Sequence, residues 1–230
     1  MNSKKYIPAL LFLVLTNFSL VNAQSAYRFG TKPSININKG LPDDFSINFK
    51  AESRQSLASG TFSGESFLGF DYQLTDLSLI ASKRVGLNNK LAGGYLIRLR
   101  NGQNIHKAVQ QFTLVRRYTR FRMAHRFASD QAFATGIPTE LRLRYRVIGE
   151  FPLNGESVDI QEFYLKISNE YINAFQKDEY DLEIRLAPLL GYVFSENNKF
   201  EFGLNYRISS FLNASARNSF WLSLNWYLKV

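Results

Sequence analysis

Three arginines stand at alternate positions in one short stretch of the chain. Residues 140–147 read Glu-Leu-Arg-Leu-Arg-Tyr-Arg-Val, so apolar or aromatic residues separate Arg142, Arg144 and Arg146. A β-strand directs successive side chains to opposite faces, so this spacing predicts three guanidinium groups on one face of a strand. Guanidinium groups bind carboxylates and phosphates through paired hydrogen bonds. The stretch therefore predicts either a network of arginine–carboxylate pairs or a surface that attracts anions.

Further charged residues occupy matching polar positions in neighbouring candidate strands. Together they predict a charge network in the lumen of a barrel, where it fills a narrow interior, forms a basic constriction that favours anionic solutes, or does both. The predicted members of this network are Arg98, Arg100, Arg122, Arg126, Asp130, Glu140, Arg142, Arg144, Arg146, Glu162, Glu170, Glu183, Arg185, Glu201 and Arg207.

Groups that serve catalysis or metal binding are scarce. The chain has two histidines and no cysteine. His125 shares the apolar parity of Met123 and Phe127, and His106 falls in an expected outer loop, Asn101–His106, without a Ser–Gly elbow or paired carboxylates nearby. We expect no enzyme activity, no metal and no cofactor. The alternative is a lipid-modifying enzyme, a lipid A or phospholipid hydrolase that acts through one of the histidines.

Alternation of apolar and polar residues recurs every 10 to 15 residues, and helical periodicity is nowhere sustained. This pattern predicts an all-β, up-and-down antiparallel transmembrane β-barrel of about 12 strands, or of 10 without the weak N-terminal pair, since bacterial barrels use even numbers. The expected strands are Ser34–Lys39, Phe45–Glu52, Ser66–Leu74, Leu77–Arg84, Lys90–Arg100, Lys107–Arg117, Arg120–Ala128, Thr139–Phe151, Asp159–Ile172, Asp181–Phe194, Lys199–Ser209 and Ser219–Val230.

The connections support an up-down arrangement. Counted back from a last strand that ends in the periplasm, short periplasmic turns are expected at Ser195–Asn198, Asn154-Gly155, Tyr118-Thr119 and Gly86–Asn89. The same parity places the longer links Ser129–Pro138, Asn173–Tyr180 and Ser210–Asn218 outside the cell. One link, Arg54–Glu65, conflicts with this scheme because it is long and yet falls on the periplasmic side.

Aromatic residues and the energetic cost of buried charge indicate which face meets lipid. Pairs such as Phe220 and Trp226 share the apolar parity and lie towards opposite ends of a strand, as in two interfacial girdles. An arginine on the lipid face costs about 2–4 kcal/mol at mid-bilayer, so the arginines are expected to face the lumen. The alternative is a soluble periplasmic lipocalin-like carrier, whose apolar residues face inward.

The two ends of the chain predict export to the outer membrane. Lys4 and Lys5 precede an apolar run that ends near Ala23, which predicts a signal peptide over residues 1–23 and one barrel domain over residues 24–230. The amphipathic strand Phe220–Val230 is the segment expected to be read by the barrel-assembly machinery. A net charge of +9 suits outer-membrane lipids and the phosphates of lipopolysaccharide, and we expect no nucleic acid partner and a monomer.

Short motifs run in a recognisable order from Leu68 to the C-terminus. They include Gln110-Gln111-Phe112, His125-Arg126 with Asp130-Gln131, Arg142-Leu143-Arg144-Tyr145-Arg146, Pro152-Leu153-Asn154-Gly155, and Asn169-Glu170. This order resembles a family of bacterial outer-membrane barrel-like proteins known only as domain of unknown function 2490. The resemblance implies an outer-membrane location and supplies no activity.

Overall fold

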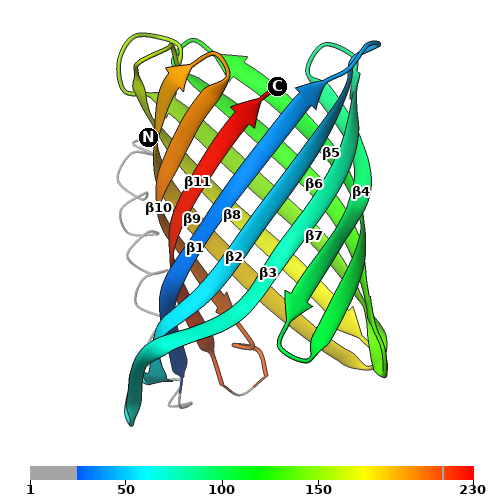
Figure 1. Ribbon diagram of the computed structural model, residues 1–230, viewed down its shortest axis with the longest axis vertical. Helices are drawn as coiled ribbons and strands as arrows, with labels where there is room; N and C mark the ends of the chain where they lie inside the picture. The colour runs from blue at the N-terminus through cyan, green and yellow to red at the C-terminus, as the bar shows by residue number, and fades with distance from the viewer. Residues whose placement is uncertain (1–24, 214) are drawn as a thin grey trace, which may run out of the picture.

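Alternating apolar and polar residues form long strands throughout this protein, whose computed structural model describes residues 25–213 and 215–230. The strands close into a barrel (Figure 1). They are β1 (Ala26–Gly40), β2 (Phe45–Thr61), β3 (Ser66–Val85), β4 (Asn89–Arg100), β5 (Gln103–Tyr118), β6 (Phe121–Ala134), β7 (Ile137–Pro152), β8 (Phe163–Gln176), β9 (Glu179–Ser195), β10 (Asn198–Ser209) and β11 (Arg217–Lys229).

The prediction of an all-β barrel is confirmed, and each strand is hydrogen-bonded to the next along the chain. The expected signal peptide over residues 1–23 lies outside the described residues. Among the residues that are described, no helix is long and apolar enough to cross a membrane.

The described chain has 11 strands, so the predictions of about 12 and of 10 are both wrong. The two strands expected at Ser66–Leu74 and Leu77–Arg84 are one strand, β3. The intervening Thr75 and Asp76 suggest a turn by their polarity, but Asp76 instead points into the lumen and is 7% exposed. Because its partner Arg98 is supplied by the next strand, the polar residue fits a continuous strand without a chain reversal.

Joining those two strands also removes the conflict at Arg54–Glu65. That segment is not a link, because β2 continues to Thr61 and the connection to β3 spans only residues 62–65. With one strand fewer in the count, this connection lies at the same end of the barrel as the turn at residues 101–102. The assignment of Arg54–Glu65 to the end of the barrel at which β11 finishes is therefore wrong.

An odd number of strands in a closed ring requires one parallel pair, and this pair is β1 with β11. Ala26 lies opposite Arg217 and Asn38 opposite Lys229, while every other neighbouring pair is antiparallel. Inside the barrel, the Ser34 hydroxyl donates to Asn225 Oδ1 at 2.8 Å across this seam. The expectation of a wholly antiparallel barrel is wrong at this one position.

Connections at the C-terminal end of the barrel, where β11 finishes, agree largely with prediction. The turns at residues 86–88, 119–120 and 196–197 are short, as expected. Asn154-Gly155 is the exception, because it lies in a longer loop over residues 153–162. Backbone bonds from Gln161 N to Val193 O at 2.7 Å and from Val193 N to Glu162 O at 3.1 Å fasten this loop to β9.

Connections at the opposite end are shorter than predicted. The expected loops Ser129–Pro138 and Asn173–Tyr180 are strand except for the turns at residues 135–136 and 177–178, and Asn101–His106 reduces to residues 101–102. In this last turn Gly102 has φ +78°, a conformation that the Asn-Gly pair favours in two-residue hairpins. The link at residues 210–216 is the longest at this end.

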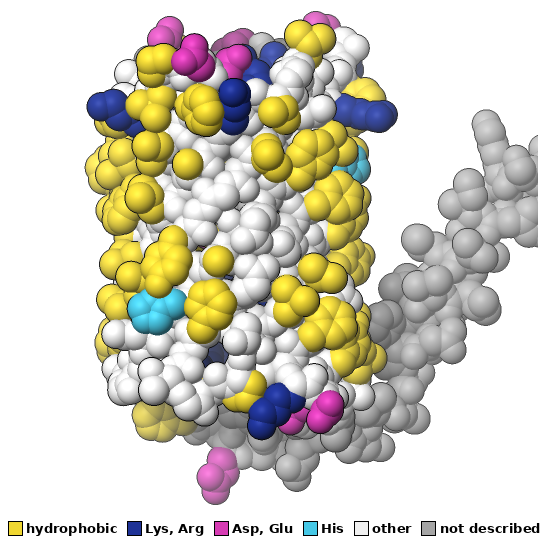
Figure 2. Space-filling model, turned by 90° about the vertical axis from the view of Figure 1, so that its right-hand side faces the viewer, with side chains coloured by type: hydrophobic (Ala, Val, Ile, Leu, Met, Phe, Trp, Pro, Cys, Tyr) yellow, Lys and Arg dark blue, Asp and Glu magenta, His cyan; other side chains and the backbone are white. Residues whose placement is uncertain are grey.

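Apolar side chains form the outer wall of the barrel. Leu79, Tyr95, Leu141, Leu190 and Phe202 all point outward and are between 39% and 55% exposed. Figure 2 shows hydrophobic side chains along the wall, while the charged side chains visible on this face gather towards the two ends. The described part of the chain therefore has an apolar outside and a polar inside.

One polar patch interrupts the outer wall on β5 and β6. The Gln110 and Gln131 amides bond each other at 3.2 Å, and the Ser129 hydroxyl donates to Gln110 Oε1 at 2.8 Å. Because these groups satisfy one another, the patch carries a smaller desolvation cost than three separate polar side chains would.

Neighbouring glycines in β4 differ in how closely the next strand approaches them. A Cβ on Gly94 would lie 2.7 Å from Ile80 Cα in β3, whereas a Cβ on Gly93 would have Val109 O at 3.8 Å as its only close contact. We expect Gly94→Ala to lower the free energy of unfolding by about 1–3 kcal/mol through overpacking and Gly93→Ala to leave it nearly unchanged. Equilibrium unfolding of the refolded variants in urea measures both, and equal effects would contradict the close approach.

Candidate functional site

Glu170 of β8 is the centre of the largest charge cluster in the lumen. Its side chain is 4% exposed and accepts bonds from Arg144 Nη2 at 2.7 Å, Arg146 Nη2 at 2.7 Å and Arg185 Nη1 at 3.3 Å. The strand register makes this possible, because Arg146 and Arg185 lie directly opposite Glu170 on β7 and β9. One carboxylate thus holds three guanidinium groups supplied by both of its neighbouring strands.

The same cluster extends along β6 and β9. Asp130, which is fully buried, pairs with Arg142 and also accepts a bond from Arg144 Nη1 at 3.3 Å. On the other side, Arg185 Nε donates to Glu183 Oε1 at 2.6 Å. The chain therefore joins these side chains into one continuous network across four strands.

A second cluster lies on β1 to β4, and Arg98 is the one member that the sequence predicts. Glu52 accepts bonds from Lys50 at 2.7 Å and Arg54 at 2.8 Å, and Lys32 lies 3.8 Å away. Asp76 pairs through both oxygens with Arg98, at 2.7 and 2.8 Å. Glu52 and Lys50 share the polar parity of their expected strand, so parity could have identified them. Arg54 and Asp76 stand where links were expected, which hid them.

A third cluster surrounds Glu201 of β10, nearer the C-terminal end. Lys166 Nζ donates to both oxygens of this fully buried carboxylate at 2.8 Å, and the Tyr164 and Tyr227 hydroxyls donate to it at 2.8 and 2.9 Å. Lys199 lies over the Tyr227 ring at 4.9 Å. Lys166 and the two tyrosines were likewise missed, although they have the inward parity of their strands.

Not all of the predicted network residues belong to these clusters. Arg122 is 46% exposed near the C-terminal end and pairs with Glu150 at 2.9 Å. Arg100 is exposed where β4 ends. Glu162 lies in the loop over residues 153–162, where it bonds Asn154 at 3.0 Å, so its expected position in an inward-facing strand is wrong. Glu140 lies 3.9 Å from Arg142.

The lumen keeps a large excess of positive charge after these pairings. A cavity of about 510 Å³ is lined, in the described part of the chain, by thirteen lysines and arginines and by three carboxylates, those of Glu52, Asp76 and Glu170. Asp130 and Glu201 lie behind the lining and neutralise part of the excess. The remaining charge favours anions in the cavity.

Much of this charge lies in one row of side chains that runs along the inner face of the barrel from each strand to the next. Directly paired residues, one on each of seven consecutive strands from β4 to β10, form this basic row. Neighbouring strands are about 4.8 Å apart, so an anion in the lumen meets closely spaced donors along the row, which Glu170 interrupts at β8. The members are Lys90, Thr113, Arg126, Arg146, Glu170, Arg185 and Arg207.

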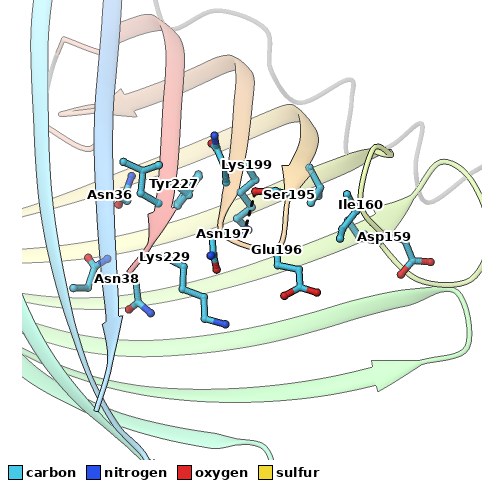
Figure 3. Close-up of a pocket in the computed structure, with 15 residues that line it drawn as sticks. Asn36, Asn38, Asp159, Ile160, Ser195, Glu196, Asn197, Lys199, Tyr227 and Lys229 are labelled. Carbon is cyan, nitrogen blue, oxygen red and sulfur yellow. Dashed lines mark hydrogen bonds between the residues drawn. The ribbon is translucent and has the colours of Figure 1, made fainter.

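A second cavity, of about 630 Å³, opens at the C-terminal end between β1, β2, β9, β10, β11 and the loop over residues 153–162. Figure 3 shows Asn36, Asn38, Lys199 and Tyr227 among the side chains around it. Asn36, Asn38, Asn48 and Tyr227 line this mouth cavity and the lumen cavity alike. These four residues therefore border both cavities.

Both histidines lie away from the lumen network. His106 belongs to β5 rather than to a loop, and its Nδ1 is 2.6 Å from the Tyr95 hydroxyl. His125 Nδ1 is 2.9 Å from the Tyr145 hydroxyl. Over residues 25–213 and 215–230, no group of three or more histidine, aspartate or glutamate side chains could hold a metal ion.

Comparison with known sequences gives one match. The model of the family described as "Protein of unknown function (DUF2490)" matches residues 30–219, a range that runs from β1 into β11. Neither a curated protein nor a solved structure matches the chain.

Proposed function

Since this chain belongs to the DUF2490 family, whose function is unknown, we propose its role from the geometry of the barrel: it is an outer-membrane pore that favours small anions. The observation that carries the proposal is the lining of the lumen, where thirteen basic side chains face three carboxylates. Pores select ions through the sign of the charges that line them, so this lining favours anions over cations.

The strand lengths, the closure and the apolar outer surface of the barrel favour a location in a membrane. Membrane-spanning strands need about 9–11 residues, and the shortest strands here, β4 and β10, have 12. Because the barrel is closed, no strand edge has unpaired backbone groups. The interior of a lipid bilayer requires such complete pairing. Exposed leucine, phenylalanine and isoleucine side chains on the outside are the residues that acyl chains accept most readily.

Conductance in planar bilayers tests the pore. With a potassium chloride gradient across the bilayer, the refolded protein should give a reversal potential of the sign that marks chloride as the more permeant ion. An absence of current, or a preference for potassium, would contradict the proposal.

One substitution tests whether the lining sets this selectivity. Arg207 is 8% exposed, and its Nε donates to Asn205, with no carboxylate within 4.0 Å among the described residues, so Arg207→Gln removes a charge without breaking an ion pair. The loss of about 1 kcal/mol of attraction between an anion in the lumen and one charge of the lining should lower the chloride-to-potassium permeability ratio roughly fivefold. Arg116→Gln is the control, because Arg116 is exposed near the end of β5 with the outward parity of Gln110 and should leave the ratio unchanged.

A further inference from the structure

Two adjacent arginines in the basic row carry buried nitrogens without a partner. Arg126 Nε and Arg146 Nε are shielded from solvent, and neither is hydrogen-bonded within the described residues. Arg126 lies directly opposite Arg146 in the pairing of β6 with β7, and both line the lumen cavity. Buried polar groups are nearly always bonded, so the chain leaves these two guanidinium groups incompletely paired, and because both residues line the cavity an anion in the lumen can bind their cavity-facing side.

The surroundings define what that acceptor must be. Arg146 is held in place through Nη2, which bonds Glu170 Oε2 at 2.7 Å, whereas Arg126 has no carboxylate within 4.0 Å in the described part of the chain. On the far side of Arg126 the basic row continues with the hydroxyl of Thr113 and the ammonium group of Lys90. The site thus offers several donors, of which three are cationic, and Glu170 is the one carboxylate that is paired with any of them among the described residues.

We propose that Arg126 and Arg146 bind a phosphate group, with Thr113 and Lys90 beside it, as a specific site inside the pore. A tetrahedral dianion presents several acceptor oxygens, and guanidinium groups bond two of these at once. Residues opposite each other on adjacent strands are about 5 Å apart, which lets one phosphate contact both guanidinium groups. The proposal deepens the proposed function, because a solute reaches these residues only through the same lumen.

Calorimetric titration of the refolded full chain in detergent tests the site. Inorganic phosphate should bind, and sodium chloride at the same ionic strength should not displace it. Arg126→Gln should weaken phosphate binding roughly ten- to hundredfold, as expected for the loss of charge-assisted hydrogen bonds. Arg116→Gln is the control and should bind as the parent chain does, because Arg116 is exposed near the end of β5 and has the outward parity of Gln110.

A second variant and a lipid competitor complete the titration experiment. Arg126→Lys retains the charge but loses the planar donor pair, so it should bind more weakly than the parent even if Arg126→Gln fails to fold. Phosphatidic acid in mixed micelles presents the same phosphate on a lipid that is too large for the lumen, and it should not compete with inorganic phosphate. Unchanged phosphate binding in the folded Arg126 variants, or competition by the lipid, would overturn the site.

The site and the pore fail in different ways. A protein that conducts chloride but does not bind phosphate keeps the proposed function and loses this inference. A protein that binds phosphate through Arg126 but gives no current keeps the site and loses the pore.

Discussion

Replacement of Glu170 by glutamine should lower the free energy of unfolding by about 3–5 kcal/mol, the cost of removing one partner from a buried ion pair. Glutamine keeps the shape of the side chain but removes the charge that Arg144, Arg146 and Arg185 share. Three guanidinium groups would then lie close together on one part of the lumen wall without the charge that they share. Denaturant unfolding measures the loss through the fluorescence of Trp221 and Trp226, which both lie in β11.

The matched control for this substitution is Glu183→Gln. Among the described residues Glu183 pairs with Arg185 alone, and its side chain is 25% exposed against 4% for Glu170, so its loss should cost clearly less than the loss of Glu170. If the two variants unfold alike, water or bound anions rather than Glu170 neutralise the arginines, and the central role of this carboxylate is wrong.

Among substitutions on the outer wall, Leu79→Arg should lower the free energy of unfolding the most. Leu79 is 55% exposed and lies opposite Phe49 and Tyr95, which are exposed and apolar as well. In a bilayer the charge should cost about 2–4 kcal/mol, whereas on the surface of a soluble carrier the same change should stay within about 0.5 kcal/mol. Refolding into lipid vesicles followed by denaturant titration distinguishes the two environments.

Leu87→Arg is the control that separates the effect of exposure from the effect of a position on the outer wall. Leu87 is 94% exposed, more than Leu79, but it lies in the turn over residues 86–88. A charge there should be tolerated in either environment. Equal tolerance of both substitutions would remove the basis for an outer-membrane location; the lipocalin-like carrier is already wrong in its orientation, because the apolar residues face outward.

Period-two alternation is the part of this fold that the sequence predicts well. Polar residues at every second position, as at Arg142, Arg144 and Arg146, are determined by local strand geometry, and the structure has these three side chains in the lumen. The turns at residues 86–88 and 119–120 are likewise local and were predicted. The number of strands was not, because Asp76 has the composition of a turn and its partner, Arg98, is 22 residues away.

The closure of the barrel and the make-up of the site depend on contacts between residues distant in sequence. The pairing of β1 with β11 joins Ser34 to Asn225, which are 191 residues apart, and no local pattern specifies its direction. The gathering of three arginines on Glu170 depends on the register of β7, β8 and β9. Parity alone predicts which face a side chain occupies but does not predict its neighbours.

The parallel seam has a consequence for the topology of the whole chain. Because β1 and β11 run in the same direction, Ala26 enters the barrel at one rim and Lys229 leaves it at the other. In a membrane, reporter domains fused ahead of β1 and after β11 would thus be displayed in different compartments, whereas a barrel with an even number of strands presents both on one side. The proposed outer-membrane location therefore requires a net crossing of the chain in either orientation.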